Sequence, residues 1–154
     1  MARTIGIGHQ DFKVLRKNNL FYIDKTDFIR QWWENFDSVT LIARPRRFGK
    51  TLTMSMVESF FSVEYAQEKA LFEGLSIWQE EAYRKLQGTY PVLYLTFADI
   101  KETSFVQTRK KICQIITNLY SKYDFLLEGD FLKAEEKEYF RKISPDMEDV
   151  ECYL

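Results

Sequence analysis

The chain has 154 residues, a length that suits one globular domain with its own hydrophobic core. The net charge of −1 gives no overall argument for binding to nucleic acid or to an anionic membrane. Two cysteines and one histidine argue against a disulfide framework, a zinc site and a Ser-His-Asp triad. No apolar run approaches the ~18 residues of a membrane span, so we expect no membrane partner and a cytoplasmic location.

Residues 1–37 are predicted to form an N-terminal extension ahead of the main domain. A short strand is expected over residues 20–23, and an amphipathic helix follows it to about residue 36. The apolar positions of this helix recur at helical spacing and are Phe28, Ile29, Trp32, Trp33 and Phe36. The two tryptophans either pack in the core, which their spacing favours, or form a platform on which a nucleic-acid base can stack.

The main domain, residues 38–154, is predicted to open with a strand, a basic loop and a helix. Residues 38–43 are nearly continuously apolar, as is typical of a strand buried on both faces of a sheet. The loop then reads Arg44-Pro45-Arg46-Arg47-Phe48-Gly49-Lys50-Thr51, and a helix is expected from there to about Phe61. This order is that of a phosphate-binding (Walker A) loop, whose usual form is G-x-x-x-x-G-K-[ST].

Each residue type at the end of this loop suits the phosphates of a nucleotide. A helix N-terminus offers free backbone N–H groups, and Gly49 lets the backbone come close to the ligand. Lys50 can contact the β- and γ-phosphates and stabilise their charge, and the Thr51 hydroxyl can ligate Mg²⁺. We therefore predict ATP and Mg²⁺ as cofactors. The predicted nucleotide contacts are Arg44, Pro45, Arg46, Arg47, Phe48, Gly49, Lys50, Thr51 and Leu52.

One position departs from the common pattern, because Arg44 stands where the first glycine is usual. Pro45 pre-sets the next φ angle, and the arginines of the loop add positive charge beside the expected phosphates. The tripeptide Gly49-Lys50-Thr51 by itself also occurs in ordinary turns with a solvated lysine. The predicted strand before it and helix after it favour the phosphate-binding interpretation.

Beyond the loop, the sequence predicts several helices and one more strand. Helices are expected over residues 64–72, 79–87 and about 104–122, with one or two short helices over 123–143 and a strand over 91–97. Two strands joined by crossover helices form a right-handed parallel βαβ unit. The predicted fold class is therefore α/β, a P-loop NTPase-like parallel sheet with flanking helices and with strands 38–43 and 91–97 at its centre.

Several segments of the chain resemble the bacterial AAA-ATPase-like family. They are Tyr22-Ile23-Asp24-Lys25-Thr26, the loop with Ala43 before it, Leu71-Phe72-Glu73-Gly74-Leu75 and Tyr90-Pro91-Val92. An Arg-Pro-Arg-Arg-Phe-Gly-Lys-[Ser/Thr] loop is usual in that family, so the resemblance accounts for Arg44. Its members usually continue to a Walker B strand, and many then carry a nuclease-like domain of the PD-(D/E)xK type, neither of which is matched here. The resemblance implies nucleic acid as a partner only through such a domain, and it allows a homo-oligomer, since AAA-type ATPases often act as rings.

A P-loop ATPase also needs a carboxylate that holds Mg²⁺ or orients the attacking water. Asp99 is the internal candidate, either as a metal-site carboxylate or as a polar residue at the end of strand 91–97. A Walker B pair usually has two adjacent acids, and here Ile100 follows. Near the end of the chain, Ser144-Pro145 predicts a helix that stops after about two turns. We therefore expect an N-terminal portion, truncated before Walker B.

Three functions are consistent with these features. The first is an ATP–Mg²⁺-binding N-terminal portion of an AAA-type ATPase, inactive or weakly active until its other half is present. The second is a small P-loop kinase, which needs an arginine-bearing lid, and the C-terminal third has only Arg109 and Arg141. The third is a non-catalytic module whose arginine cluster binds nucleic-acid phosphate, which a contiguous basic stripe would support. The sequence favours the first.

Overall fold

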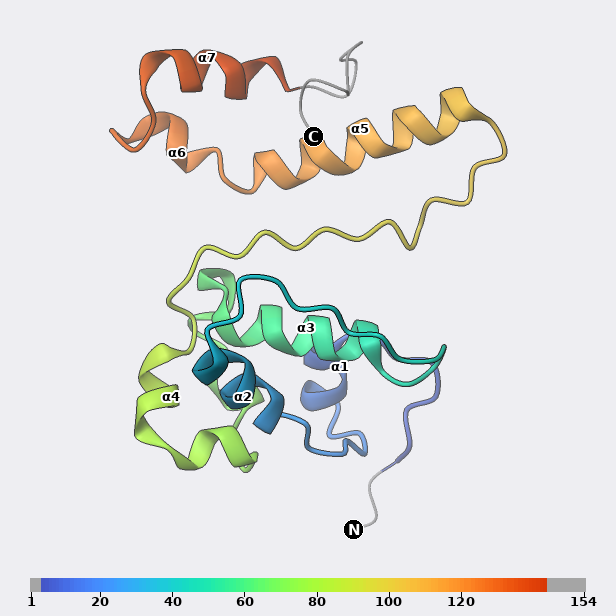
Figure 1. Ribbon diagram of the computed structural model, residues 1–154, viewed down its shortest axis with the longest axis vertical. Coiled ribbons are helices and arrows are strands. Elements are labelled where there is room, and N and C mark those ends of the chain that lie inside the picture. The colour runs from blue at the N-terminus through green and yellow to red at the C-terminus, as the bar shows by residue number, and fades with distance from the viewer. Residues whose placement is uncertain (1–3, 144–154) are drawn as a thin grey trace. The chain divides into compact units, whose positions relative to one another are not determined.

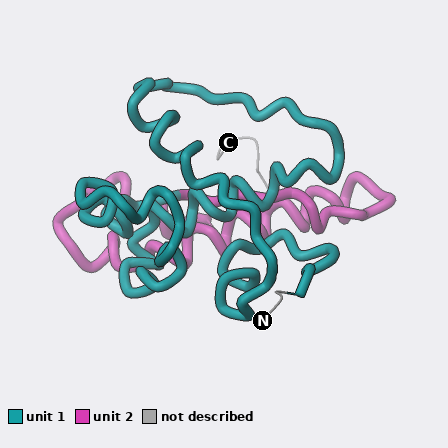
Figure 2. The backbone as a smooth tube through the Cα atoms, turned by 90° about the horizontal axis from the view of Figure 1, so that it is seen from below, with its two compact units in different colours: residues 1–92 teal, residues 93–154 magenta. Residues whose placement is uncertain are grey.

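The computed structural model describes residues 4–143, and these residues form helices joined by turns and extended segments (Figure 1). The chain divides into two compact units, unit 1 over residues 1–92 and unit 2 over residues 93–154 (Figure 2). The domain boundary predicted after residue 37 falls inside unit 1 and stays a prediction. Among the described helices, none combines the length and the apolar character needed to cross a membrane.

The helices expected to end near residue 36 and Phe61 and the helix expected over 79–87 lie close to where the sequence predicts them, because apolar spacing is a local signal. The first helix of the unit is capped by the carboxylate of Asp11, which accepts a hydrogen bond of 3.1 Å from the N–H of Val14. The helix expected over 64–72 is instead two short 3₁₀ turns. The elements of unit 1 are α1 (Phe12–Lys17), α2 (Asp27–Asn35), α3 (Lys50–Phe61), η1 (Val63–Tyr65), η2 (Lys69–Leu71), η3 (Ser76–Gln79) and α4 (Glu81–Leu86).

Helix α3 provides the centre of the core of unit 1. Its Met56 and Phe60 are fully buried, together with Phe12 of α1 and Phe72. The ring of Phe72 lies 5.1 Å from that of Phe12 and 5.2 Å from that of Phe60, measured between centroids. Aromatic contacts of this kind add about 0.5–1.5 kcal/mol each beyond the burial of their area. The C-terminal half of α3 is therefore fixed in the core, which gives its N-terminal end a rigid base.

The tryptophans of α2 belong to this core. Trp33 stacks on Phe61 with centroids 5.4 Å apart, and Trp32 meets the same ring edge-on at 5.5 Å. Both are partly buried residues packed against the core cluster. The core-packing interpretation of these tryptophans is therefore favoured over a base-stacking platform.

Side-chain hydrogen bonds join α1 to the rest of unit 1. Arg16 donates from Nε to the carbonyl of Leu71 at 2.6 Å and from Nη2 to the carbonyl of Glu73 at 2.7 Å. The N–H of Phe12 donates to the hydroxyl of Ser55 on α3 at 3.1 Å, and this bond is buried. These bonds hold α1 against α3 and against the chain that follows α3.

Unit 2 is a smaller helical assembly. Its helices are α5 (Phe105–Ser121), α6 (Phe125–Glu128) and α7 (Ala134–Lys142), and the hydroxyl of Ser104 caps α5 by accepting from the N–H of Gln107 at 3.2 Å. Cys113 and Ile116 of α5 form a small buried cluster with Ile143. The helices predicted over 104–122 and 123–143 are confirmed, whereas the helix predicted from Ser144 lies outside the described residues.

The predicted parallel sheet is wrong. The described residues contain no β-strand, and their β-type pairing is an isolated parallel bridge between Ser62 and Tyr90. The expected strands over 20–23, 38–43 and 91–97 are irregular chain without a β-ladder.

The exposure of the expected strands gives the physical reason for this correction. Val39, Leu41 and Leu93 are 86%, 87% and 69% exposed, whereas central strands are buried on both faces. Apolar, β-branched composition favours an extended backbone, but a strand also needs a neighbouring chain for its N–H and C=O groups. Within the described part of the chain, no strand lies beside these segments.

Candidate functional site

The N-terminal end of α3 is the centre of the candidate site. Gly49 precedes the helix in the left-handed region, with φ of 76°, where a residue with a Cβ is disfavoured. Its carbonyl accepts two hydrogen bonds from Thr53, one from the N–H at 2.9 Å and one from the hydroxyl at 3.0 Å. The N–H groups of residues 50–52 have no acceptor among the described residues, and no side chain caps the helix. This end of α3 therefore presents free donors and the positive end of the helix dipole.

The side chain of Lys50 folds back over the loop. Its ammonium donates to the carbonyl of Arg44 and, at 3.4 Å, to that of Pro45. No carboxylate of the described residues pairs with it, so its positive charge is not neutralised. Carbonyl oxygens that hold an ammonium in this way can be replaced by a stronger, anionic acceptor.

The three arginines of the loop add charge without a partner. The side chains of Arg44, Arg46 and Arg47 are exposed, and within the described residues none makes a hydrogen bond or an ion pair. Arg47 has φ of 67°, a left-handed conformation that is uncommon outside glycine. A strained backbone held at a charged loop is often connected with function, because folding alone does not favour it.

The remaining predicted contacts divide into exposed and packed positions. The side chains of Pro45, Phe48 and Thr51 are exposed, and that of Phe48 is 61% accessible. Leu52 packs against the core of unit 1 instead, so only its backbone can take part in the site. The exposed Thr51 hydroxyl belongs to the first turn of α3 and is free to meet a ligand there.

Lys25 is a residue of this site that the sequence prediction did not include. A Cβ built on Gly49 would lie 3.4 Å from Nζ of Lys25, so this second ammonium sits directly beside the loop. Lys25 comes from the turn before α2, 24 positions earlier in the chain than Gly49. The available signal was its place in one of the family-like segments, next to Asp24 and Thr26.

Comparison with known proteins gives the family of this chain. Residues 6–150 match the family model described as "Predicted AAA-ATPase". The chain belongs to this predicted AAA-ATPase family. The resemblance that the loop indicated is thereby confirmed, and membership points to nucleotide binding in general.

Relatives of this AAA-ATPase family member give no further functional detail. A curated relative, an uncharacterized protein in the vnfD 5′ region of Azotobacter chroococcum mcd 1, is 28% identical over 116 residues. The alignment covers 75% of this chain and 21% of the relative, so the chain spans about a fifth of that protein's length. No solved structure matches the chain.

The predicted metal-site carboxylate of this AAA-ATPase chain lies in unit 2. Asp99 is exposed, in a turn where the N–H of Ile100 donates to the carbonyl of Phe97 at 3.1 Å. Among the described residues, no group of three or more His, Cys, Asp or Glu side chains forms a metal site. The role of Asp99 stays a prediction.

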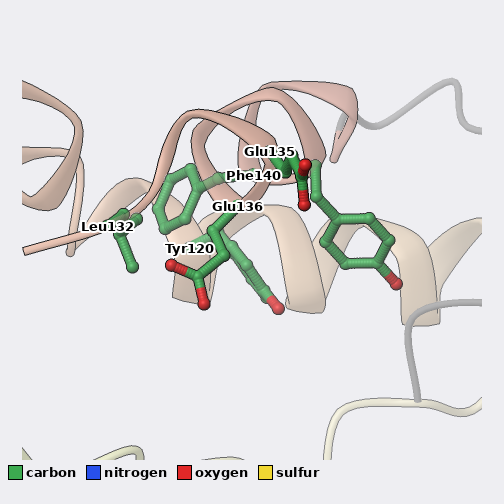
Figure 3. Close-up of a pocket in the computed structure, with 6 residues that line it drawn as sticks. Tyr120, Leu132, Glu135, Glu136 and Phe140 are labelled. Atoms are coloured by element: carbon green, nitrogen blue, oxygen red, sulfur yellow. The ribbon is translucent and has the colours of Figure 1, made fainter.

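Two open hollows of the AAA-ATPase chain are lined by residues other than those of the basic loop. The larger, of about 360 Å³, is on unit 2 (Figure 3) and is lined by Tyr120, Leu132, Glu135, Glu136, Tyr139 and Phe140. The smaller, of about 240 Å³, is on unit 1 and is lined by Trp32, Trp33, Phe36 and Asp37. Both combine aromatic rings with carboxylates and lack a cation, so neither suits the phosphates of a nucleotide.

Proposed function

We propose that this chain binds a nucleoside triphosphate with Mg²⁺, in the first place ATP, through loop 44–49 and the first turn of α3. The observation that carries the proposal is the cluster of free backbone donors and cations without a carboxylate partner at one end of a helix. The free N–H groups of residues 50–52 lie there with the ammonium of Lys50 and the unpaired arginines of the loop. A chain of phosphates carries enough negative oxygens to satisfy both the backbone and the side-chain donors.

Lys50 and Gly49 have distinct roles in this proposal. Lys50 exchanges the carbonyls of Arg44 and Pro45 for phosphate oxygens, whose negative charge attracts the ammonium more strongly than a neutral carbonyl does. Gly49 leaves the space above the first N–H groups open, because it has no side chain. The exchange favours the bound state since it replaces neutral acceptors of Lys50 with anionic ones.

The donor set at the helix end also fits Mg²⁺. The exposed Thr51 hydroxyl is a hard oxygen ligand, and Mg²⁺ is commonly held by one or two protein oxygens together with phosphates and several waters. A cage of carboxylates is not required for this mode of binding. Bound Mg²⁺ would supply charge neutralisation to the phosphates, with Thr51 as its ligand from this chain.

Hydrolysis needs a further group beyond the phosphate-binding loop. Charge stabilisation by Lys50 lowers the barrier fully only when a carboxylate also positions the attacking water. Asp99 is the candidate for this carboxylate in the chain. We also propose that the whole protein hydrolyses the nucleotide. Binding of nucleotide is the step that the loop itself supports.

The test is a calorimetric titration of the purified chain with MgATP. Lys50→Ala should weaken binding by at least about tenfold, or ~1.4 kcal/mol, because it removes the charge that meets the phosphates. Lys85→Ala is the matched control, since Lys85 lies on α4 in a surface ion pair with Glu81 and not at the loop. Equal ATP affinity of all three proteins would refute the assignment. A basic loop that binds random-sequence DNA more tightly than ATP, with a steep salt dependence, would favour the nucleic-acid module instead.

A further inference from the structure

The ammonium of Lys25 has no partner in the part of the chain that the structure describes. The residue is half-buried, and no described side chain or carbonyl accepts a hydrogen bond from its Nζ. No ion pair joins Lys25 to the neighbouring Asp24, whose carboxylate accepts from Thr26 and Ser76. The ammonium is therefore available to an anionic ligand, which would form a charge-assisted hydrogen bond with it.

The surroundings of Lys25 also favour the binding of an anion. Its Nζ lies 3.4 Å from the place of a Gly49 Cβ, at the positive end of the α3 dipole. Cations stabilise the C-terminal ends of helices and are disfavoured at the N-terminal ends. Lys50 brings a second ammonium to the same end of α3. Two lysines beside a helix N-terminus form a positively charged region that a bound anion would stabilise.

The backbone that carries Lys25 is held firmly on both sides. Asp24 Oδ1 accepts from the N–H of Thr26 at 2.9 Å and from its hydroxyl at 2.7 Å, and Asp24 Oδ2 accepts from the N–H of Ser76 at 2.7 Å. Thr26 is fully buried. On the other side, Tyr22 contacts Sδ of Met56 in α3 through its hydroxyl at 3.1 Å. The backbone of Lys25 therefore has a fixed position relative to α3.

Titration of Asp24 is consistent with this fixed turn. Partial burial alone raises the pKa of Asp24, but the hydrogen bonds from Thr26 and Ser76 outweigh it and hold the pKa below its ordinary value. The carboxylate is therefore ionised at neutral pH, and its oxygens accept the hydrogen bonds from Thr26 and Ser76.

We propose that Lys25 is a second phosphate-binding lysine, which contacts the phosphate chain of the nucleotide together with Lys50. The inference rests on the proposed function and makes it more specific. Two ammonium groups and the free N–H groups of one helix turn match a ligand with several adjacent phosphates better than one with a single phosphate. Lys25 therefore contributes to the preference for nucleoside tri- and diphosphates over monophosphates.

The first experiment compares nucleotide affinities by calorimetry. Lys25→Met keeps the aliphatic stem and removes the charge, Lys25→Arg keeps the charge, and Lys85→Met is the control on α4. We expect Lys25→Met to lose at least about fivefold in MgATP affinity, to lose little affinity for AMP, and to melt no lower than the wild type, whereas Lys25→Arg retains most of the ATP affinity. If Lys25 were merely structural, Lys25→Met would lower the melting temperature and leave the ratio of ATP to AMP affinity unaltered, and that result would overturn the inference.

The second experiment needs no variant and so does not depend on folding of a mutant. The wild-type chain is acetylated at lysines with and without saturating MgATP, and the rate at each lysine is read by mass spectrometry. We expect MgATP to protect Lys25 and Lys50 and to leave Lys85 unchanged. Protection of Lys50 without protection of Lys25 overturns this inference alone. A wild-type chain that does not bind MgATP overturns the proposed function and this inference with it.

Discussion

Replacement of Gly49 by alanine separates the geometric role of this residue from its role in binding. Gly49 has φ of 76°, so any residue with a Cβ pays the cost of the left-handed region there. That cost is about 1–2 kcal/mol, and for a unit of this size ~1 kcal/mol lowers the melting temperature by roughly 4–8 °C. The new methyl group would meet Lys25 Nζ at 3.4 Å, an ordinary contact distance, so no clash adds to the cost.

The structure offers a matched control at Gly74. Its φ is also 76°, and a Cβ built there has nothing within 4 Å. Gly74→Ala should therefore lose stability through the same backbone effect without placing an atom in the candidate site. Only Gly49→Ala puts a methyl group between Lys25 and the first turn of α3, where we propose that phosphate oxygens lie.

The assay is thermal melting followed by circular dichroism without nucleotide, and then calorimetry with MgATP below both melting temperatures. We expect both variants to melt several degrees below the wild type, by roughly 4–8 °C for each kcal/mol lost. Only Gly49→Ala should lose about tenfold or more in affinity. An equal loss of affinity in Gly74→Ala would show that stability, and not the site, controls binding. A Gly49→Ala variant that melts like the wild type would refute the left-handed geometry.

Two further predictions concern the backbone and the turn that hold the site. Arg47→Gly should be more stable than Arg47→Ala by about 1 kcal/mol in urea unfolding, because both remove the charge and only glycine relieves the left-handed φ of 67°; equal stabilities would contradict this. Asp24 has a pKa lowered below its ordinary 3.8, so its stabilising contribution is present above that value and is lost as the pH falls through the folded pKa. Asp24→Asn should accordingly unfold more readily than the wild type at pH 7, and the difference should shrink towards pH 3, whereas a pH-independent difference would exclude this linkage.

The helices could be predicted from the sequence because the signals that start and stop them are local. Ser104 begins α5 with a side-chain cap, and Gly49 stands before the first residue of α3. The sheet could not be predicted in the same way. The apolar run that contains Val39 and Leu41 favours an extended backbone, but pairing depends on another segment whose position no short pattern specifies. The structure leaves both side chains exposed instead.

The candidate site was predictable to the extent that it is contiguous in the chain. Gly49, Lys50 and Thr51 are neighbours, and phosphate binding was predicted from their residue types together with a strand before them and a helix after them. The structure contains the helix, whereas the described residues before the loop form no strand. Lys25 reaches the same place only because the turn around Asp24 is bonded to Ser76 and the following α2 packs on α3. That arrangement is tertiary, and no periodicity or motif spacing in the sequence encodes the distance between Lys25 and Gly49.

The placement of the tryptophans gives the two units different optical properties. All 3 tryptophans, at positions 32, 33 and 78, belong to unit 1, and two of them pack against Phe61 while the third stacks on Phe72. Tryptophan emission therefore reports the loosening of the core around α3, and unit 2 contributes no tryptophan to it. The far-ultraviolet circular dichroism signal comes from the helices of both units, and α5 of unit 2 contributes to it. Comparison of the two signals in one denaturation series would measure whether the core that supports the loop unfolds together with α5 or independently of it.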